Sequence, residues 1–230
     1  MSETNALNTG LKNPFDSWKS IAISLYMTLV GYGVLVGIPV INTAWVTLLG
    51  FSEAQGGRIA GMDLGGLAVG GVVTAILITK VDRRFLAILG MFLAVLANAL
   101  CITMVDYEQV FWLRFLSGFG SGIFTSVAVS SLGASSKPAR AFNAMLFAFA
   151  FSQALEIHFL PLLTMSGIYI AFIVGFLSTL PFINWIPSFS DSKSYLGLEQ
   201  SKETIKQVSP DTTIPKFVPW LCLAAMVVTY

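Results

Sequence analysis

Six long apolar segments constrain what this chain can fold into. A helix needs about 20 apolar residues to cross the roughly 30 Å hydrocarbon core of a bilayer. Only 11% of the residues are charged, against roughly 25% in soluble domains. The sequence therefore predicts an all-α polytopic membrane protein with six spans, truncated within helix seven. The six spans are expected at 21–49, 57–79, 85–105, 109–133, 141–164 and 167–187, and the incomplete seventh at 217–230.

The polar segments divide the chain into four regions. We expect a cytoplasmic tail at 1–20, a six-span bundle at 21–187, a cytoplasmic linker at 188–216 and the start of a seventh span at 217–230. The linker is rich in Ser, Lys, Glu and Thr, which is typical of a flexible connection between two membrane bundles. Because 217–230 is too short to cross a bilayer, we expect the chain to be a fragment of a longer carrier with a second bundle.

Basic residues gather on one side of the predicted spans. Lys and Arg are retained on the cytoplasmic side during insertion. The opposite turns carry Glu53, Asp106 and Glu108, with Arg58 at the edge of a span. We therefore expect a cytoplasmic amino terminus, in a plasma membrane of the bacterial inner-membrane type. The basic residues on the cytoplasmic side are Lys12, Lys19, Lys80, Arg83, Arg84, Lys137, Arg140, Lys193, Lys202, Lys206 and Lys216.

Five polar side chains from four predicted spans share one depth in the membrane. At a rise of about 1.5 Å per residue, Arg114 lies roughly 8 Å inside the outer end of its span. A charged group in hydrocarbon costs at least about 2.5 kcal/mol, so it normally faces a partner or a water-filled cavity. The five residues therefore predict a transport pathway or coupling network, in which the three charged side chains neutralise one another. They are Asn42, Asp63, Arg114, Glu156 and His158.

A plainer interpretation of the same residues stays open. Arg114 can extend outward along its long stem, and Glu156 can be protonated or satisfied by a neighbouring helix. His158 lies two residues from Glu156 on a different helix face, so both side chains cannot line one narrow seam. For His158, a packing role and a proton-relay role fit the sequence equally well.

Small residues cluster in the segments 57–79 and 109–133. They let two helix backbones approach closely in lipid, where no hydrophobic effect drives helix association. A phosphate-binding loop is excluded because no strand precedes either cluster. We therefore interpret three glycines of the second cluster as helix-packing positions, namely Gly118, Gly120 and Gly122.

The stretch RFLSGFGSG, residues 114–122, resembles a motif in the fourth span of the major facilitator superfamily. The family motif is R-x-x-x-G-x-G-x-G, and Arg114, Gly118, Gly120 and Gly122 match it. Six spans, a cytoplasmic start, a long linker and a following apolar run are also similar to the family plan. The resemblance covers nearly all of the chain. It implies the amino-terminal half of such a transporter, a six-helix bundle built from two inverted three-helix repeats.

A second family motif, G-x-L-x-D-R-x-G-R-R, is similar to AILITKVDRR at residues 75–84. Thr79 stands in place of the family's aspartate, and Asp82 in place of its second glycine. In the family that aspartate helps to hold the outward-facing state, so either Asp82 replaces it or the latch is weaker here. Asp82 and the matching or charge-keeping positions form the expected conformational loop, with Leu77, Lys80, Arg83 and Arg84.

The resemblance implies a secondary active transporter. Two bundles would rock about a small-solute site near their interface. Arg114 would either bind an anionic group of the substrate or change partners with Glu156 as a proton is taken up. The implied partners are a small-molecule substrate, protons, the lipid bilayer and a missing carboxy-terminal bundle. We expect no cofactor and no nucleic acid partner. A half-bundle that acts only as a dimer, and a membrane protein without transport activity, are the alternatives.

Other functional classes fit the sequence less well. The fifth-span motif of drug–proton antiporters is absent from FSQALEIHFLPLLTMSG at 151–167, so drug efflux is not supported. A seven-helix receptor would start outside the cell. A retinal protein would need a lysine inside its seventh span, whereas Lys216 precedes that span. No paired His/Glu spacing and no nucleophile beside a base occurs in any span, so we expect neither an enzyme nor a metal site.

Overall fold

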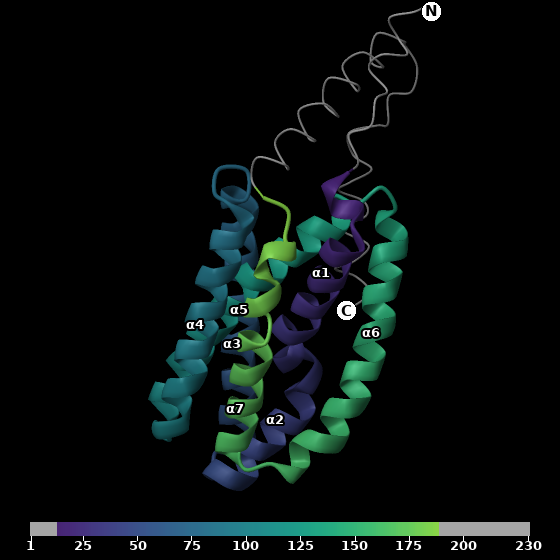
Figure 1. The fold of residues 1–230 in the computed structure, drawn as a ribbon. Helices are drawn as coiled ribbons and strands as arrows, with labels where there is room; N and C mark the ends of the chain where they lie inside the picture. The colour runs from purple at the N-terminus through teal and green to yellow at the C-terminus, as the bar shows by residue number, and fades with distance from the viewer. Residues whose placement is uncertain (1–12, 189–230) are drawn as a thin grey trace, which may run out of the picture. The chain divides into compact units, whose positions relative to one another are not determined.

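The computed structural model describes residues 13–188, and every regular element within them is a helix. Six helical segments are long and apolar enough to cross a membrane. Figure 1 shows how the helices are arranged. The prediction of an all-α protein with six membrane-length helices is therefore confirmed for this part of the chain. Residues 1–12 of the expected tail, the linker from residue 189 onward and the apolar stretch 217–230 lie outside the described residues.

The helices follow one another in the order of the predicted spans. The elements are η2 (Pro14–Asp16), α1 (Trp18–Gly31) and α2 (Gly33–Leu49) in the first span, then α3 (Glu53–Leu77), α4 (Arg83–Thr103) and α5 (Tyr107–Gly133), then α6 (Pro138–Phe159) with η3 (Leu160–Leu162), and finally α7 (Met165–Leu177) with η4 (Leu180–Trp185).

Each helical segment begins a few residues before the apolar segment predicted for it. α3 begins at Glu53 because Ser52 and Gln55 form a capping box, in which each side chain accepts the other's backbone N–H. α4 begins at Arg83 because Oδ1 of Asp82 accepts the backbone N–H of Arg84 at 2.8 Å. Hydropathy does not detect these first turns because their residues are polar.

The first span is broken in its middle, which hydropathy did not indicate. Tyr32 lies between α1 and α2 with φ −91° and ψ 3°. The glycines on either side of it let other helices approach. Gly31 lies directly against the side chain of Thr125 in α5, and a Cβ on Gly33 would lie 3.2 Å from the ring of Phe172 in α7.

α5 is the central helix of the bundle. It packs along α3 and α4 and also contacts α1, while α4 packs on α7 as well (Figure 1). One buried apolar cluster surrounds Trp45 and Tyr169, and a second includes the rings of Phe124 and Phe176, 5.2 Å apart. The outer faces expose large apolar side chains, among them Phe92. Such faces are typical of a surface that contacts lipid.

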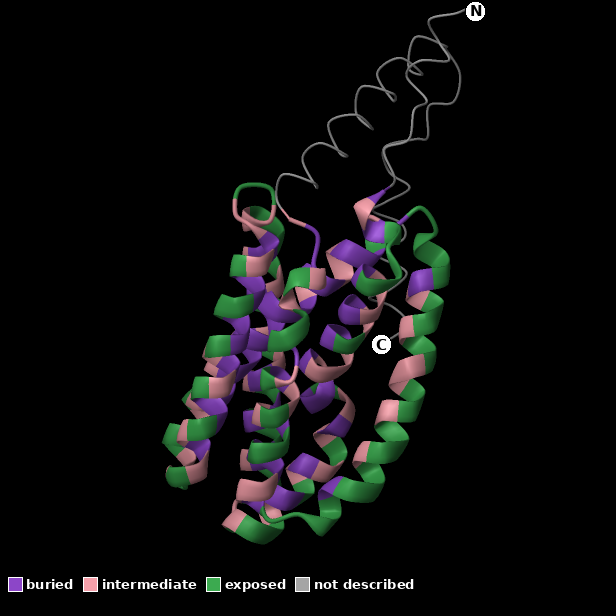
Figure 2. Cartoon of the chain, viewed as in Figure 1, coloured by how far each residue is buried: buried purple, intermediate pink, exposed green. Residues whose placement is uncertain are grey.

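α6 is the least buried of the membrane-length segments. Ala141 is its one buried residue, and Figure 2 shows the rest of the helix as exposed or intermediate. Its neighbours are α1, α2 and α5. The exposed side chains include Leu146, Phe147 and Phe151. α6 is therefore attached to the bundle along a narrow strip.

Candidate functional site

Arg114 of α5 and Asp63 of α3 form an ion pair inside the bundle. Both residues are almost inaccessible, at 1% and 3% exposure. Nε of Arg114 donates to Oδ2 of Asp63 at 3.0 Å, and Nη2 donates to the same oxygen. The structure thus brings these two predicted residues together. Because Arg114 is buried, its guanidinium does not extend outward to the membrane surface.

Asn98 of α4 is the third member of this network. Its Oδ1 accepts a hydrogen bond from Nη1 of Arg114 at 2.8 Å. Its Nδ2 donates to Oγ of Ser117 at 3.0 Å and to the backbone carbonyl of Ala94 at 2.8 Å. Asn98 is completely buried. The network therefore joins α3, α4 and α5, and it holds the orientation of the arginine from two sides.

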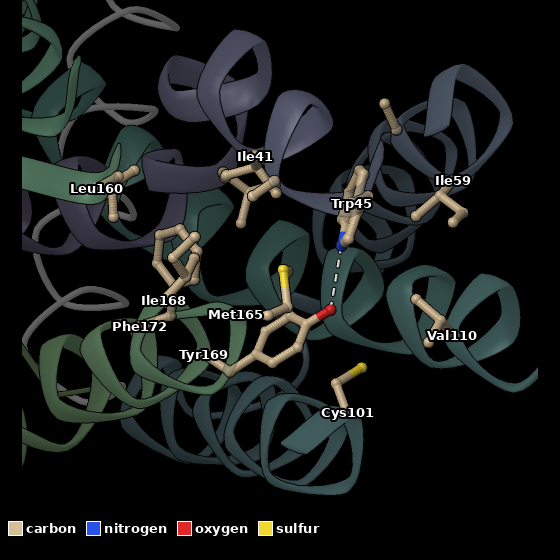
Figure 3. Packing of buried hydrophobic residues seen from close by; sticks show 13 residues of the cluster. Ile41, Trp45, Ile59, Cys101, Val110, Leu160, Met165, Ile168, Tyr169 and Phe172 are labelled. Carbon is tan, nitrogen blue, oxygen red and sulfur yellow. Dashed lines mark hydrogen bonds between the residues drawn. The ribbon is translucent and has the colours of Figure 1, made fainter. Parts of the chain in front are cut away.

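A second buried hydrogen bond lies close to the guanidinium. Nε1 of Trp45 in α2 donates to the hydroxyl of Tyr169 in α7 at 3.1 Å, the dashed line in Figure 3. The Cζ atom of Arg114 lies 6.0 Å from the centroid of the Tyr169 ring, within range of a cation–π interaction. Both aromatic residues are buried. Side chains from five helices therefore meet around Arg114.

The pairing explains how a permanent cation is tolerated there. An isolated ionised group inside a protein carries a desolvation penalty of several kcal/mol, which a well-placed partner offsets. Asp63 neutralises the charge of Arg114, and Asn98 occupies a further N–H. Removal of one partner from a buried pair typically costs about 3–5 kcal/mol, because the other charge is left uncompensated.

The glycines of α5 bring the backbones close enough for this network. A Cβ on Gly118 would collide with the backbone of Asp63 itself, and one on Gly122 with the backbone of Leu67 in α3. Gly120 faces the backbone of Gly90 in α4. The residues that follow the arginine in the motif therefore lie at the α3 and α4 contacts, and Gly118 sets the distance at which Asp63 faces Arg114.

Glu156 lies apart from the arginine network. Its Oε1 accepts a hydrogen bond from Oγ of Ser152 at 3.0 Å, within α6. Its Oε2 is buried and has no hydrogen-bond partner among the described residues. The carboxyl lies beside Gly37 of α2, where a Cβ would be 2.9 Å from Oε2. The expected mutual neutralisation therefore involves Arg114 and Asp63, while Glu156 forms no ion pair with Arg114 in this conformation.

The remaining two residues of the predicted layer also lie elsewhere. Oδ1 of Asn42 in α2 is buried without a hydrogen-bond partner among the described residues and abuts Gly56 of α3. His158 is exposed, and its ring contacts that of Phe159 with centroids 5.0 Å apart. Residues predicted at one depth thus occupy separate places around the bundle, because depth does not determine which way a helix is turned.

The residues of the expected conformational loop tie three helix ends together. Arg83 is buried, donates from Nη1 to the hydroxyls of Ser130 and Ser131 in α5 at 3.2 and 3.1 Å, and lies over a ring of η2. Arg84 donates to the carbonyls of Asn184 and Ile186 at 3.1 and 2.8 Å. The other members are the α4 cap Asp82, the half-buried Leu77 and the exposed Lys80.

Sequence reasoning missed three residues that complete the arginine site. Asn98 lies in an otherwise apolar segment, and this polar side chain is the sequence feature that could have identified it as a site residue. Trp45 and Tyr169 gave no such signal, because aromatic residues are common at membrane interfaces. Their burial and mutual hydrogen bond are visible only in the packed structure.

No family model matches the chain, and no curated protein matches it significantly. Within residues 13–188, no three His, Cys, Asp or Glu side chains come close enough together to hold a metal ion. The six apolar helices and the buried charge pair thus define the class of protein, a polytopic membrane protein with an intramembrane ion pair.

Proposed function

We propose that the chain is the amino-terminal bundle of a secondary active transporter of the major facilitator type. It moves a small solute across the membrane by alternating access, coupled to protons. In the natural protein, a second bundle completes the transporter. The observation that carries the proposal is the pattern of contacts between the six spans.

The spans are numbered one (α1 and α2), two (α3), three (α4), four (α5), five (α6 with η3) and six (α7 with η4). When spans one to three are exchanged with spans four to six, every pair of spans in contact becomes a pair that is also in contact. Contacts of span two with span four correspond to those of span five with span one, and three–four corresponds to six–one. One–two corresponds to four–five, while one–four and three–six correspond to themselves. A random six-helix packing has no reason to obey this exchange. Because each set holds an odd number of antiparallel spans, the two sets have opposite directions in the membrane, as expected of inverted repeats.

The buried ion pair supports a transport role within that architecture. Charged residues inside membrane spans are rare and mark substrate or proton pathways. Arg114 and Asp63 come from spans four and two, the pair of spans with the most extensive contact. Protonation of Asp63 would weaken its hold on Arg114 and release the cation for another partner. This gives a physical means by which proton uptake alters the contact between two helices.

The test uses the full natural gene product in liposomes on a solid-supported electrode. Amino acids, sugars, carboxylates and amines are applied in turn under an imposed proton gradient. At least one class should produce a transport current. Arg114→Gln should abolish accumulation of that solute while membrane insertion stays intact. The matched control is Arg58→Gln, because Arg58 is exposed at the start of α3.

Two outcomes contradict the proposal. An unchanged current in Arg114→Gln would remove this residue from the coupling step. A natural gene product with an intact mass of 24.8 kDa would mean that no second bundle follows. Transport would then require a dimer of this bundle, which crosslinking in the native membrane would reveal.

A further inference from the structure

Glu156 occupies a second polar site, at the contact between α6 and α2. Its buried Oε2 faces the glycine face of α2, formed by Gly33 and Gly37. A Cβ on Gly33 would lie 3.6 Å from Oε1, and one on Gly37 would lie 2.9 Å from Oε2. The two glycines, four residues apart, therefore form a shallow niche for the carboxyl group. Leu160 closes it, at 3.1 Å from the same Gly37 position.

Charged groups on the helices around α6 do not compensate Glu156. Arg114 of α5 is bound to Asp63 and Asn98. Lys19 of α1 lies over the ring of Trp185. Tyr26 of α1 hydrogen-bonds Ser178, and the ring of Tyr32 at the α1–α2 break contacts that of Phe149 in α6, with centroids 5.6 Å apart. No ion pair joins Glu156 to any ionisable group on α1, at this break, at the ends of α5 or on α6. Besides Lys19, these groups are Tyr26, Tyr32, Tyr107, Glu108, Lys137, Arg140 and His158.

We propose that Glu156 is a proton-binding site whose neutral form docks α6 onto the glycine face of α2. A carboxylate facing apolar surroundings without a cation carries a large desolvation penalty, whereas a neutral carboxyl carries only that of a polar group. In this conformation the proton is on Glu156. Its loss to water places a negative charge against Gly33 and Gly37, which offer no compensating cation. The carboxylate is then expelled from the niche, and α6 moves away from α2.

The packing of α6 leaves room for this movement. A cavity of about 450 Å³ separates its first turns from α1, with Ile21 and Ala144 in its wall. A cavity of about 400 Å³ lies between its last turns and α2, lined by Thr43, Thr47 and Ile157 among others. Two contacts hold α6 in place: Phe149 near its middle meets Tyr32, and Glu156 in its last turn meets Gly37. A change at Glu156 therefore acts on one of the few points of attachment.

The first experiment detects the protonated carboxyl of Glu156 by chemical labelling. The full chain in liposomes is treated with the membrane-soluble reagent dicyclohexylcarbodiimide over a range of pH. The O–H of a neutral carboxyl adds across a C=N bond of the reagent, and acyl migration to nitrogen leaves a stable N-acylurea. Peptide mass spectrometry then shows one added reagent on Glu156. Labelling should fall by about tenfold per pH unit once the carboxyl ionises.

Two variants control the labelling experiment. Glu156→Gln should remove the label without unfolding the protein, because the amide keeps the size of the neutral carboxyl. Glu108→Gln should leave the labelling of Glu156 unchanged, because Glu108 is exposed in the first turn of α5. Asp63 should be labelled less than Glu156, since two N–H groups of Arg114 donate to its carboxylate.

The second experiment measures the movement of α6. Spin labels are placed on the exposed Leu48 of α2 and the exposed Ile157 of α6, and a reference pair on Val72 of α3 and Phe92 of α4. Raising the pH should lengthen the α2–α6 distance and leave the reference distance unchanged. In Glu156→Gln the α2–α6 distance should stay short at every pH. Gly37→Ala, whose Cβ displaces the carboxyl, should lengthen it at low pH.

The role of this proton in transport rests on the proposed function. The outcomes nevertheless test the proton site and the transport function separately. Labelling of Glu156 with a pH-dependent α2–α6 distance supports the proton site even if no solute is transported. Transport by a protein in which Glu156 is never labelled overturns the proton site and leaves the transport proposal standing. Labelling without any change in the α2–α6 distance overturns the docking role.

Discussion

The three helices α3, α4 and α5 are held together differently from α6. Within the three-helix group, backbone touches backbone. Gly66 and Gly70 of α3 face the backbone of α5 so closely that a Cβ on either would collide with it, and Gly90 and Gly120 face each other between α4 and α5. The Arg114 network then joins all three helices. The group therefore has both close packing and buried polar bonds.

α6 has neither of these features along most of its length. Its one buried residue is Ala141, and a cavity lies beside each of its ends. Its polar contact with α2 is a carboxyl group against glycines, without a hydrogen bond between the helices. In lipid, helices associate through close packing and polar bonds rather than the hydrophobic effect. The difference indicates a rigid core and one weakly attached helix.

The largest effect is expected from breaking the ion pair of the rigid group. Arg114→Met should lower the free energy of unfolding by about 3–5 kcal/mol, because Asp63 is left buried without a counter-charge. The measurement is a titration with denaturing detergent in mixed micelles. The double variant Arg114→Met/Asp63→Leu should recover most of the loss. Equal stability of the single and double variants would show that charge pairing does not hold this group together.

A smaller effect tests the close approach of backbones. Gly66→Ala should cost about 1–3 kcal/mol, because its Cβ would collide with the backbone carbonyl of Phe115. Gly65→Ala, one position along the same helix, has open space around it. It should be neutral or stabilising by up to about 1 kcal/mol, since alanine favours a helix over glycine. If the same detergent titration gave both variants equal stability, the distinction between packed and free faces of α3 would be wrong.

The smallest effect is expected on α6. Phe147→Ala should change the free energy of unfolding by less than about 0.5 kcal/mol, because the side chain is 69% exposed and surface substitutions rarely exceed this value. The neighbouring Phe151→Ala, also exposed, serves as a repeat of the test. A loss above about 2 kcal/mol in either variant would show that α6 packs against more of the protein than residues 13–188 contain.

Much of the fold was predictable from local properties. The six spans were placed within a few residues because the transfer of a segment into hydrocarbon depends on its own side chains. The helix starts were displaced because caps such as Ser52 and Asp82 are polar. The break at Tyr32 was not predicted, because neighbouring glycines in an apolar run do not by themselves end a helix.

The candidate site was predictable only in part. Asp63, Arg114 and Glu156 were expected to neutralise one another because their depths agree, yet the arginine meets Asp63 and Asn98 while Glu156 faces α2. Depth follows from the position of a residue along its helix. Which side chain a buried polar residue meets depends instead on the rotation of the two helices about their axes and on which helices are neighbours. Asn42 and His158 differ from the expectation for the same reason.

The sequence by itself determined that residues 13–188 form six apolar helices and that Arg114 needs compensation inside them, since both follow from the cost of placing groups in hydrocarbon. Only the tertiary structure decided which carboxylate compensates it, because Gly118 brings α5 against the backbone of Asp63. It also decided that Glu156 has no cation beside it within residues 13–188, because α6 lies on the glycine face of α2, away from the arginine network.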